Sequence, residues 1–268
     1  MIAMLRRAAA VGAASAIAAC SLFPSLDEYE SNGATSPGGA DSSTTSESGA
    51  GANLCSAVGS VCDDFEQEVG GWASSGTAPE RSSSVTPAPA NGAWALHATG
   101  DESTPGYREH AVESKAQGAF ALRMRILVSK APGSTSADYA DIATLRGNKG
   151  ARVLLRLEHQ PKWKVLLSNS SESGESIEGG ATLNRWLCVE IDTLLGDASR
   201  GSVRLFVDGI SSGTSSFATF ASAEDIYDQL RIGILQVSQG AFDAYVDDLV
   251  YAQFNVDSLS NAPLIGCN

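Results

Sequence analysis

The sequence of 268 residues predicts an all-β protein, an antiparallel β-sandwich of two sheets with a jelly-roll arrangement. Short apolar runs with strand-like alternation recur along most of the chain, and turns rich in Gly, Ser and Pro separate them. No long amphipathic helix is apparent, and only residues 223–227 have the pattern of a short helix. We expect the sandwich to span residues 54–268, a length typical of one domain of this kind.

The strands of the first half follow from alternation and turns. We expect strands over residues 61–66, 94–98, 120–126, 153–158 and 163–167. The strand from Phe120 is the clearest, because every second side chain is large and apolar, as on a half-buried strand. Pro161 stands between the last two strands, which predicts a hairpin there.

A pair of strands is expected between Arg185 and Ile210. From Trp186 onward, apolar residues at odd positions alternate with Cys188, Glu190 and Asp192, so the two sets face opposite sides. The second strand, residues 201–207, ends in Asp208-Gly209, where glycine permits the positive φ of a tight turn. Strands over residues 230–235 and 242–251 complete the set.

The N-terminus has the features of an export signal. Residues 1–19 contain Arg6 and Arg7 followed by a short, alanine-rich apolar run, as in a secretory signal peptide. The ending Ile-Ala-Ala-Cys resembles the bacterial lipobox, which implies cleavage before Cys20 and lipid attachment to its sulfur. Ser21 then favours the outer membrane or cell surface. The alternative is an ordinary signal peptide followed by a chance cysteine.

Residues 20–53 are expected to form a disordered tether. Their composition is dominated by Ser, Gly, Thr, Ala and Asp, so they bury too little apolar surface to offset the entropy cost of ordering. A flexible tether of this length reaches on the order of 30 Å, which would hold the domain just off the membrane.

The charge of the chain excludes one class of partner. The formal net charge is -13, and there is no excess of Lys and Arg to neutralise phosphates, so we expect no binding to nucleic acid. Strong acidity suits an exported domain.

Four cysteines remain after Cys20. Cys55, Cys62, Cys188 and Cys267 form an even set in an exported chain, which predicts two disulfides with three possible pairings. None of them forms a Cys-x-x-Cys pair, so a zinc site is not expected.

Several segments together resemble the concanavalin A-like lectin/glucanase superfamily, and its laminin-G-like branch in particular. These are the strand that begins at Trp186, the Phe-Val-Asp-Gly turn ending at Gly209, the segment Leu-Arg-Ile-Gly from Leu230, and the closing Val-Asp-Asp-Leu-Val-Tyr strand. The resemblance implies a concanavalin A-like sandwich and a carbohydrate-type ligand.

The strongest enzymatic hint lies at Glu190 and Asp192. Glu-Ile-Asp resembles the start of the Glu-x-Asp-x-x-Glu signature of laminarinase-like glycoside hydrolases of the same superfamily. Retaining hydrolysis needs two carboxyl groups about 5–5.5 Å apart. Leu195 stands where the second catalytic glutamate would be, so the pair is interpreted as the polar face of a strand and no catalytic residue is predicted.

A second motif, Gly-Ile-Ser-Ser-Gly from Gly209, matches the nucleophile elbow of serine hydrolases. That elbow needs a strand-to-helix turn and a later histidine, whereas His97, His110 and His159 all precede Ser211. We therefore interpret this motif as a chance match. The histidines are expected to be ordinary structural or surface residues.

Acidic residues occur near both ends of the domain. In the superfamily, an opening Phe-Glu and a closing Asp-Asp strand often lie side by side and share a structural Ca²⁺, and carboxylates are ligands that Ca²⁺ prefers. The resemblance therefore implies a calcium site at Asp63, Asp64, Glu66, Asp247 and Asp248. The alternative is that these are simply exposed acids.

Aromatic rings are the usual platforms for sugars. Trp163 follows a turn between two lysines and can face a groove, while Tyr107 and Tyr139 are expected in loops, so these three are the candidate ligand-binding residues. Large rings are more often buried, and the core is the alternative for each tryptophan.

The sequence thus predicts an exported, lipid-anchored, non-catalytic module of the cell envelope whose partner is a glycan or another cell-surface ligand. Two alternatives remain. One is a divergent glycoside hydrolase or polysaccharide lyase that uses Glu190 or Asp192. The other is a structural or protein-interaction lipoprotein of the envelope.

Overall fold

The computed structural model describes residues 60–267 except 69, 90, 116–117, 149, 169–172, 196–200, 218–225, 257 and 263. The expected signal peptide, Cys20, the tether and Cys55 lie outside the described residues. Within them, no helix is both long and apolar enough to cross a membrane.

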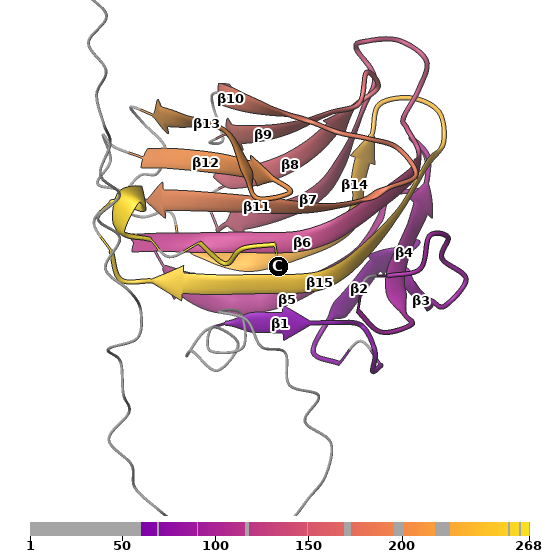
Figure 1. Ribbon diagram of the computed structural model, residues 1–268, viewed down its shortest axis with the longest axis horizontal. Coiled ribbons are helices and arrows are strands. Elements are labelled where there is room, and N and C mark those ends of the chain that lie inside the picture. Colours follow the sequence, from indigo (N-terminus) through magenta and orange to yellow (C-terminus); the bar gives the residue numbers. More distant parts are fainter. Residues whose placement is uncertain are drawn as a thin grey trace, which may run out of the picture. The chain divides into compact units, whose positions relative to one another are not determined.

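Two antiparallel sheets form the domain (Figure 1). The eight-stranded sheet, which we call sheet A, has the order β13-β12-β11-β6-β15-β4-β3, and β1 also pairs with β15. Its strands are β1 (Val61–Asp63), β3 (Glu80–Ser82), β4 (Ala95–Gly100), β6 (Gly118–Lys130), β11 (Trp186–Leu195), β12 (Gly201–Val207), β13 (Ile210–Phe217) and β15 (Phe242–Phe254).

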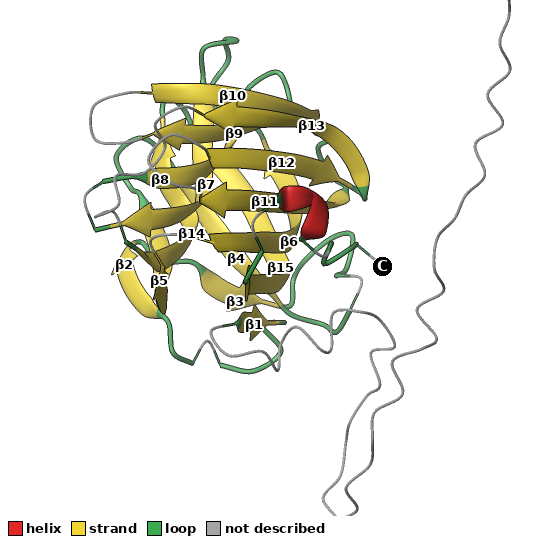
Figure 2. Cartoon of the chain, turned by 90° about the vertical axis from the view of Figure 1, so that its left-hand side faces the viewer, coloured by secondary structure: helices red, strands yellow, loops and turns green. Residues whose placement is uncertain are grey.

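The seven-stranded sheet, which we call sheet B, has the order β10-β9-β8-β7-β14-β5-β2. Its strands are β2 (Ala73–Gly76), β5 (Gly106–Lys115), β7 (Tyr139–Gly147), β8 (Arg152–Glu158), β9 (Lys162–Ser168), β10 (Ser173–Gly180) and β14 (Tyr227–Val237). The sheets are stacked as two layers in Figure 2, with β10 beside β13 at one edge. The prediction of an antiparallel jelly-roll sandwich is therefore confirmed.

A single large apolar core fills the space between the sheets. The alternation expected on β6 is present, because Phe120, Leu122, Met124 and Ile126 all face this core. On β11 the odd positions also face the core, whereas Glu190 and its even neighbours face outward from sheet A. Each sheet therefore has one inner face and one outer face, and function has to be sought on the outer faces or the loops.

The turns explain most of the strand boundaries. Asp208 (φ 50°) and Gly209 (φ 75°) close the two-residue hairpin between β12 and β13, as the sequence predicts. Pro161 lies in the short connection between β8 and β9, which confirms the second hairpin. β1 ends at Asp63, because Phe65 takes a positive φ of 54° and turns the chain away. The helix expected over 223–227 falls largely outside the described residues, and Tyr227 begins β14.

Candidate functional site

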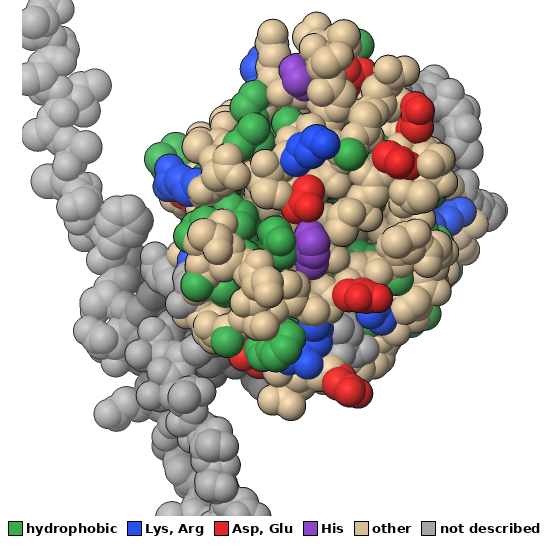
Figure 3. Space-filling model, turned by 90° about the vertical axis from the view of Figure 1, so that its right-hand side faces the viewer, with side chains coloured by type: hydrophobic (Ala, Val, Ile, Leu, Met, Phe, Trp, Pro, Cys, Tyr) green, Lys and Arg blue, Asp and Glu red, His purple; other side chains and the backbone are tan. Residues whose placement is uncertain are grey.

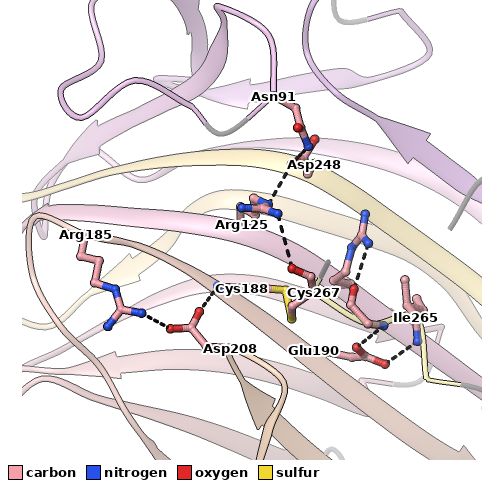
Figure 4. Close-up of a disulfide and its surroundings, with 11 residues drawn as sticks. Asn91, Arg125, Arg185, Cys188, Glu190, Asp208, Asp248, Ile265 and Cys267 are labelled. Carbon is pink, nitrogen blue, oxygen red and sulfur yellow. Dashed lines mark hydrogen bonds and ion pairs between the residues drawn. A yellow bond between two sulfur atoms is a disulfide. The ribbon is translucent and has the colours of Figure 1, made fainter. Parts of the chain in front are cut away.

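Glu190, the first half of the enzymatic hint, binds the C-terminal segment of the protein. Its Oε1 accepts the backbone N–H of Ile265 at 2.8 Å, and its Oε2 accepts that of Gly266 at 3.0 Å (Figure 4). The side chain is 2% exposed. Both carboxylate oxygens are thus occupied by backbone donors, and this carboxylate is not presented to a substrate.

A disulfide fixes the same segment. Cys188, two residues before Glu190 on β11, is bonded to Cys267. Arg123 of β6 donates to the Gly266 carbonyl at 3.0 Å. Ile265 packs on the outer face of sheet A, against a small apolar cluster formed by Ala121, Val250 and Ala252. The C-terminal segment therefore lies across sheet A, over β6 and β11 (Figure 1).

The second acid, Asp192, is also fully buried. Arg204 of β12 donates to its Oδ2 at 2.8 Å, and its other oxygen has no partner among the described residues. Burial, reinforced by the neighbouring Glu190 carboxylate, raises the pKa of Asp192 to about 7. Glu190 is consequently an anchor for the chain end, whereas Asp192 is paired with Arg204 of β12.

The observed disulfide selects among the three pairings left open by the sequence. Cys188 pairs with Cys267 across 79 residues, and Cys62 is also disulfide-bonded. Cys55 lies outside the described residues.

At the opening of the domain, the acids expected to bind calcium are used mainly by the protein itself. Asp63 accepts the Phe65 N–H at 2.8 Å and the indole N–H of Trp72 at 2.9 Å. Glu66 uses one oxygen, Oε1, to accept the N–H groups of Ala93 and Trp94, both at 2.8 Å. These bonds shape the turn after β1 and tie it to the start of β4.

The closing acids are in contrasting environments. Asp248 bonds Arg125 at 3.0 Å and Asn91 at 2.8 Å, so its charge is balanced (Figure 4). Asp247 is completely buried; its Oδ1 accepts the Asp248 N–H, whereas its Oδ2 has no partner among the described residues. Burial and the nearby carboxylates of Asp248, Glu66 and Asp64 raise the pKa of Asp247 to about 8.

These acids do not form a complete metal-binding cluster. No group of three or more Asp, Glu, His or Cys side chains among the described residues is arranged to hold a metal ion. Nevertheless, the buried Oδ2 of Asp247 has no hydrogen-bond partner among the described residues, and carboxylate oxygens are ligands that Ca²⁺ prefers. The Glu66 carboxylate is close enough to contribute to the raised pKa of Asp247.

The expectation that Trp163 binds ligand is wrong. Its side chain is fully buried, on the inner face of β9, where it packs in the main core. Alternation along β9 points Lys162 and Lys164 outward and turns the ring between them inward. The core alternative was the correct one for this tryptophan and for Trp72.

Tyr107 and Tyr139 lie in strands, not in loops, and both belong to the outer face of sheet B. Tyr107 is in β5, and the Arg231 guanidinium lies over its ring, 4.7 Å from the centroid. Tyr139 begins β7, where the Arg156 guanidinium lies 3.5 Å from its ring centroid and the Gln236 amide donates to its hydroxyl at 3.0 Å. The two rings are thus held in place by arginines.

An open pocket of about 290 Å³ lies on this outer face of sheet B. It extends over β5, β14, β7 and β8, and the turn between β7 and β8 closes one end. It is lined by Tyr107, Asp141, Thr144, Arg146, Gly150, Arg152, Leu154, Arg231, Leu235 and Gln236. Its size is at the lower end of the range for small-ligand sites, which is about 300–1,000 Å³.

Strand register explains how these residues come together. A β-bulge at residues 141–143 of β7 sends both Ile142 and Ala143 into the core, so that Asp141 and Thr144 both face outward. Thr144 pairs with Leu154 on one side and with Arg231 on the other. The pocket is therefore built on rigid sheet positions.

Asp141 is neutralised within the pocket wall. Arg156 forms a two-point ion pair with it, Nε to Oδ1 at 2.6 Å and Nη2 to Oδ2 at 3.1 Å. Burial raises the pKa of Asp141, while Arg156 opposes that rise. The ion pair holds the guanidinium flat against Tyr139.

Sequence reasoning identified Tyr107 and Tyr139 but missed the arginines and Gln236. The missing residues lie on the neighbouring strands β7 and β8 and on β14, which is distant in sequence, and each appears as an ordinary polar residue of an amphipathic strand. The one available signal was Arg152 and Arg156 at even spacing within an apolar run.

The remaining motifs have structural roles. Ser211 lies in β13, after a strand-to-strand hairpin, so the helix that a nucleophile elbow requires is not there. His97 stacks on Tyr245, with ring centroids 4.2 Å apart, and His110 packs edge-on against Trp72.

The folded part is a β-sandwich of jelly-roll type, and comparisons with known proteins support this class. No protein-family model and no curated protein matches the sequence. Three solved structures share the fold: a botulinum neurotoxin type C chain (TM-score 0.55, 11% identity, 77% of this chain and 50% of that one), the cellulose-induced protein Cip1 (0.54, 13%, 78% and 100%) and the alginate lyase Aly36B (0.52, 10%, 75% and 99%).

These neighbours share the jelly-roll sandwich fold with this chain. The chain spans half the length of the neurotoxin chain. Cell entry of that neurotoxin depends on interaction with two ganglioside molecules. At these identities the likeness defines the fold alone.

Proposed function

We propose that this protein is an exported carbohydrate-binding module that binds glycan in the pocket on the outer face of sheet B. The observation that carries the proposal is the pairing, on one rigid face, of a pocket of about 290 Å³ with two arginine-braced tyrosine rings. Sugar recognition combines an apolar or aromatic surface with a few placed hydrogen-bonding groups.

The pocket supplies both elements. Leu235 and Tyr107 provide apolar surface, Gln236 provides an exposed amide, and the almost fully buried Thr144 and Leu154 complete the lining. Figure 3 shows one end of the sandwich, where acidic, basic and apolar side chains are interspersed. The proposal therefore places recognition on the sheet face and not on that end.

Glycan binding is tested with a glycan array probed by the full chain carrying Cys20→Ser, which removes the proposed lipid site. We expect binding to at least one glycan class and about fivefold weaker binding for Tyr107→Leu, because a ring contact contributes about 1 kcal/mol. The matched control is Tyr245→Leu, which removes a ring that stacks on His97 away from the pocket. No binding to any glycan would refute the proposed function.

The lipid anchor and the laminin-G-like relationship remain part of the proposal. The lipobox-like ending before Cys20 supports attachment to a membrane at the cell surface, with residues 20–53 as the tether. We expect Cys20→Ser to move the full chain from the membrane fraction to the soluble fraction. An unchanged distribution would refute the anchor and leave the binding proposal standing.

A structural calcium ion is also proposed, held by Glu66 and Asp247. Two observations support this site. The buried Oδ2 of Asp247 has no hydrogen-bond partner among the described residues. Ionising Asp247 also costs free energy, because it is buried near other carboxylates, and a bound cation would offset that cost. We expect Ca²⁺ to raise the melting temperature over that in EDTA, and Asp247→Asn to abolish the difference. An equal melting temperature in both conditions would refute the site.

A further inference from the structure

One arrangement of three side chains occurs twice on the outer face of sheet B. In the first copy, Arg231 donates from Nε to Glu109 at 2.5 Å, and its guanidinium lies 4.7 Å from the Tyr107 ring centroid. Tyr107 is half-buried, so part of its side chain is open to solvent. An acid thus fixes an arginine, and the arginine fixes a tyrosine. We call these three residues the Tyr107 cluster.

The second copy, which we call the Tyr139 cluster, consists of Asp141, Arg156 and Tyr139. Arg156 donates to both oxygens of Asp141, and its guanidinium lies 3.5 Å from the Tyr139 ring centroid. Tyr139 is also half-buried. A side chain that is already held in one conformation loses less entropy when a ligand binds, so each cluster presents a tyrosine that is prepared for contact.

The two tyrosines are too far apart to contact the same sugar ring. Tyr107 is on β5 and Tyr139 is on β7, with β14 between them, which separates them by roughly 10 Å across the strands. Along the strands, Tyr107 pairs with Gly233 of β14, whereas the Tyr139 carbonyl accepts the Ser238 N–H. At about 3.3 Å per residue, and with the register shift in this part of β14, this offset adds roughly 10–15 Å. A ligand that contacts both tyrosines is therefore several sugar residues long.

Gln236 connects the two clusters. It lines the pocket together with Tyr107, it is exposed, and its amide donates to the Tyr139 hydroxyl at 3.0 Å. The turn between β7 and β8 closes one end of the pocket, and Tyr139, the first residue of β7, lies at the opposite end of that strand. A chain seated beside Tyr107 can therefore continue past Gln236 along the face to Tyr139.

We propose that this face binds a linear oligosaccharide of several residues in two subsites, one at each cluster. One sugar lies in the pocket beside Tyr107, and a later sugar of the same chain contacts Tyr139, just outside the pocket lining. Gln236 forms a hydrogen bond with the sugar between them. The inference rests on the proposed function, since it names the length of glycan that the same face takes.

Isothermal titration calorimetry with the full chain carrying Cys20→Ser provides the test. The probes are the disaccharide and the hexasaccharide of four linear series, built from glucose, mannose, xylose or galacturonic acid. The disaccharide reaches one subsite, whereas the hexasaccharide is long enough to span both. Comparison within one series keeps the sugar chemistry constant while the length changes.

In a series that binds, we expect the hexasaccharide to bind at least about fivefold more tightly than the disaccharide, because the second tyrosine contributes about 1 kcal/mol. Tyr139→Leu should remove this gain and leave the affinity for the disaccharide unchanged, which also shows that the variant is folded. Tyr107→Leu should weaken the binding of both probes. Tyr245→Leu is the matched control, because its ring stacks on His97 away from both clusters, and it should bind both probes like the unsubstituted chain.

Equal affinity for the two lengths would overturn the two-subsite arrangement and leave glycan binding in the pocket standing. The same conclusion would follow if Tyr139→Leu kept the full gain with length, because a longer chain offers more binding registers even to a single subsite. Binding of none of the probes would overturn this inference, and the glycan array then decides separately whether the proposed function stands.

Discussion

The outer faces of the two sheets differ in what lies on them: the C-terminal segment packs on sheet A, whereas sheet B carries an open pocket. On sheet A, Glu190 is buried and bonded to the C-terminal segment, which a disulfide holds in place, and Asp192 is buried and paired with Arg204. On sheet B, the outer face carries an open pocket that brings together Tyr107 and three arginines from four strands. A catalytic-looking pair thus has a structural role, while scattered polar residues form the candidate site.

The difference shows that the burial and the hydrogen-bond partners of a carboxylate must be known before it is interpreted as catalytic. Glu190 uses both oxygens to bind backbone N–H groups, so removing its charge should affect stability. Arg146 is exposed on the outer face of sheet B, so removing its charge should leave stability nearly unchanged. Four predictions test this division between a closed face and an open face.

The largest effect is expected from removing the disulfide on the closed face. The double substitution Cys188→Ala and Cys267→Ala should lower the free energy of unfolding by about 2–4 kcal/mol, because the bond closes a long loop of 79 residues. Urea denaturation followed by tryptophan fluorescence measures this change. Glycan binding should survive at temperatures where the variant is folded, and a loss of binding there would mean that the two faces are coupled.

The next effect concerns the carboxylate that holds the chain end. Glu190→Gln keeps the shape of the side chain but replaces one acceptor oxygen with an amide that cannot accept a hydrogen bond. We expect about 2 kcal/mol lower stability and faster digestion of the C-terminus by carboxypeptidase. Glu178→Gln, at an exposed ion pair of sheet B, is the control and should change neither.

A pH effect follows from the buried acids. Asp247 and Asp192 have pKa values raised from 3.8 to about 8 and about 7, so the folded state binds more protons than the unfolded state between about pH 4 and pH 8. Stability should therefore fall as pH rises through this window. Calorimetry in EDTA should show a melting temperature several degrees lower at pH 8 than at pH 5, at about 2–4 °C per kcal/mol.

Asp247→Asn is the control for the pH effect, because the amide resembles the protonated carboxyl and does not titrate. This variant should show a shallower fall between pH 5 and pH 8. A melting temperature that rises over this window in the unsubstituted chain would contradict the raised pKa values.

The smallest effect is expected on the open face. Arg146→Gln should change the free energy of unfolding by less than about 0.5 kcal/mol, because the side chain is exposed on the outer face of sheet B. Chemical denaturation of the two proteins in parallel measures it. A loss of more than about 1 kcal/mol would show that Arg146 supports the fold, and it would contradict the contrast between the two faces.

Much of the fold could be predicted from the sequence, since alternation on β6 and the Asp208-Gly209 turn are set by local chemistry. The buried position of Trp163 was missed because its lysine neighbours made the segment look exposed. Alternation along one strand instead points the two lysines outward and the ring between them inward. The pocket could not be predicted, because it depends on the bulge at Asp141 and on pairing between β7, β8 and β14.

The most direct test of the open-face account is an NMR titration of the isotopically labelled full chain carrying Cys20→Ser with an oligosaccharide that binds on the glycan array. The account predicts that the largest amide shifts occur in β7, β8 and β14 around Thr144, Leu154 and Gln236. The amides of β11 and of the C-terminal segment should stay unchanged. Shifts concentrated around Glu190 and Ile265, with none in the pocket, would contradict it.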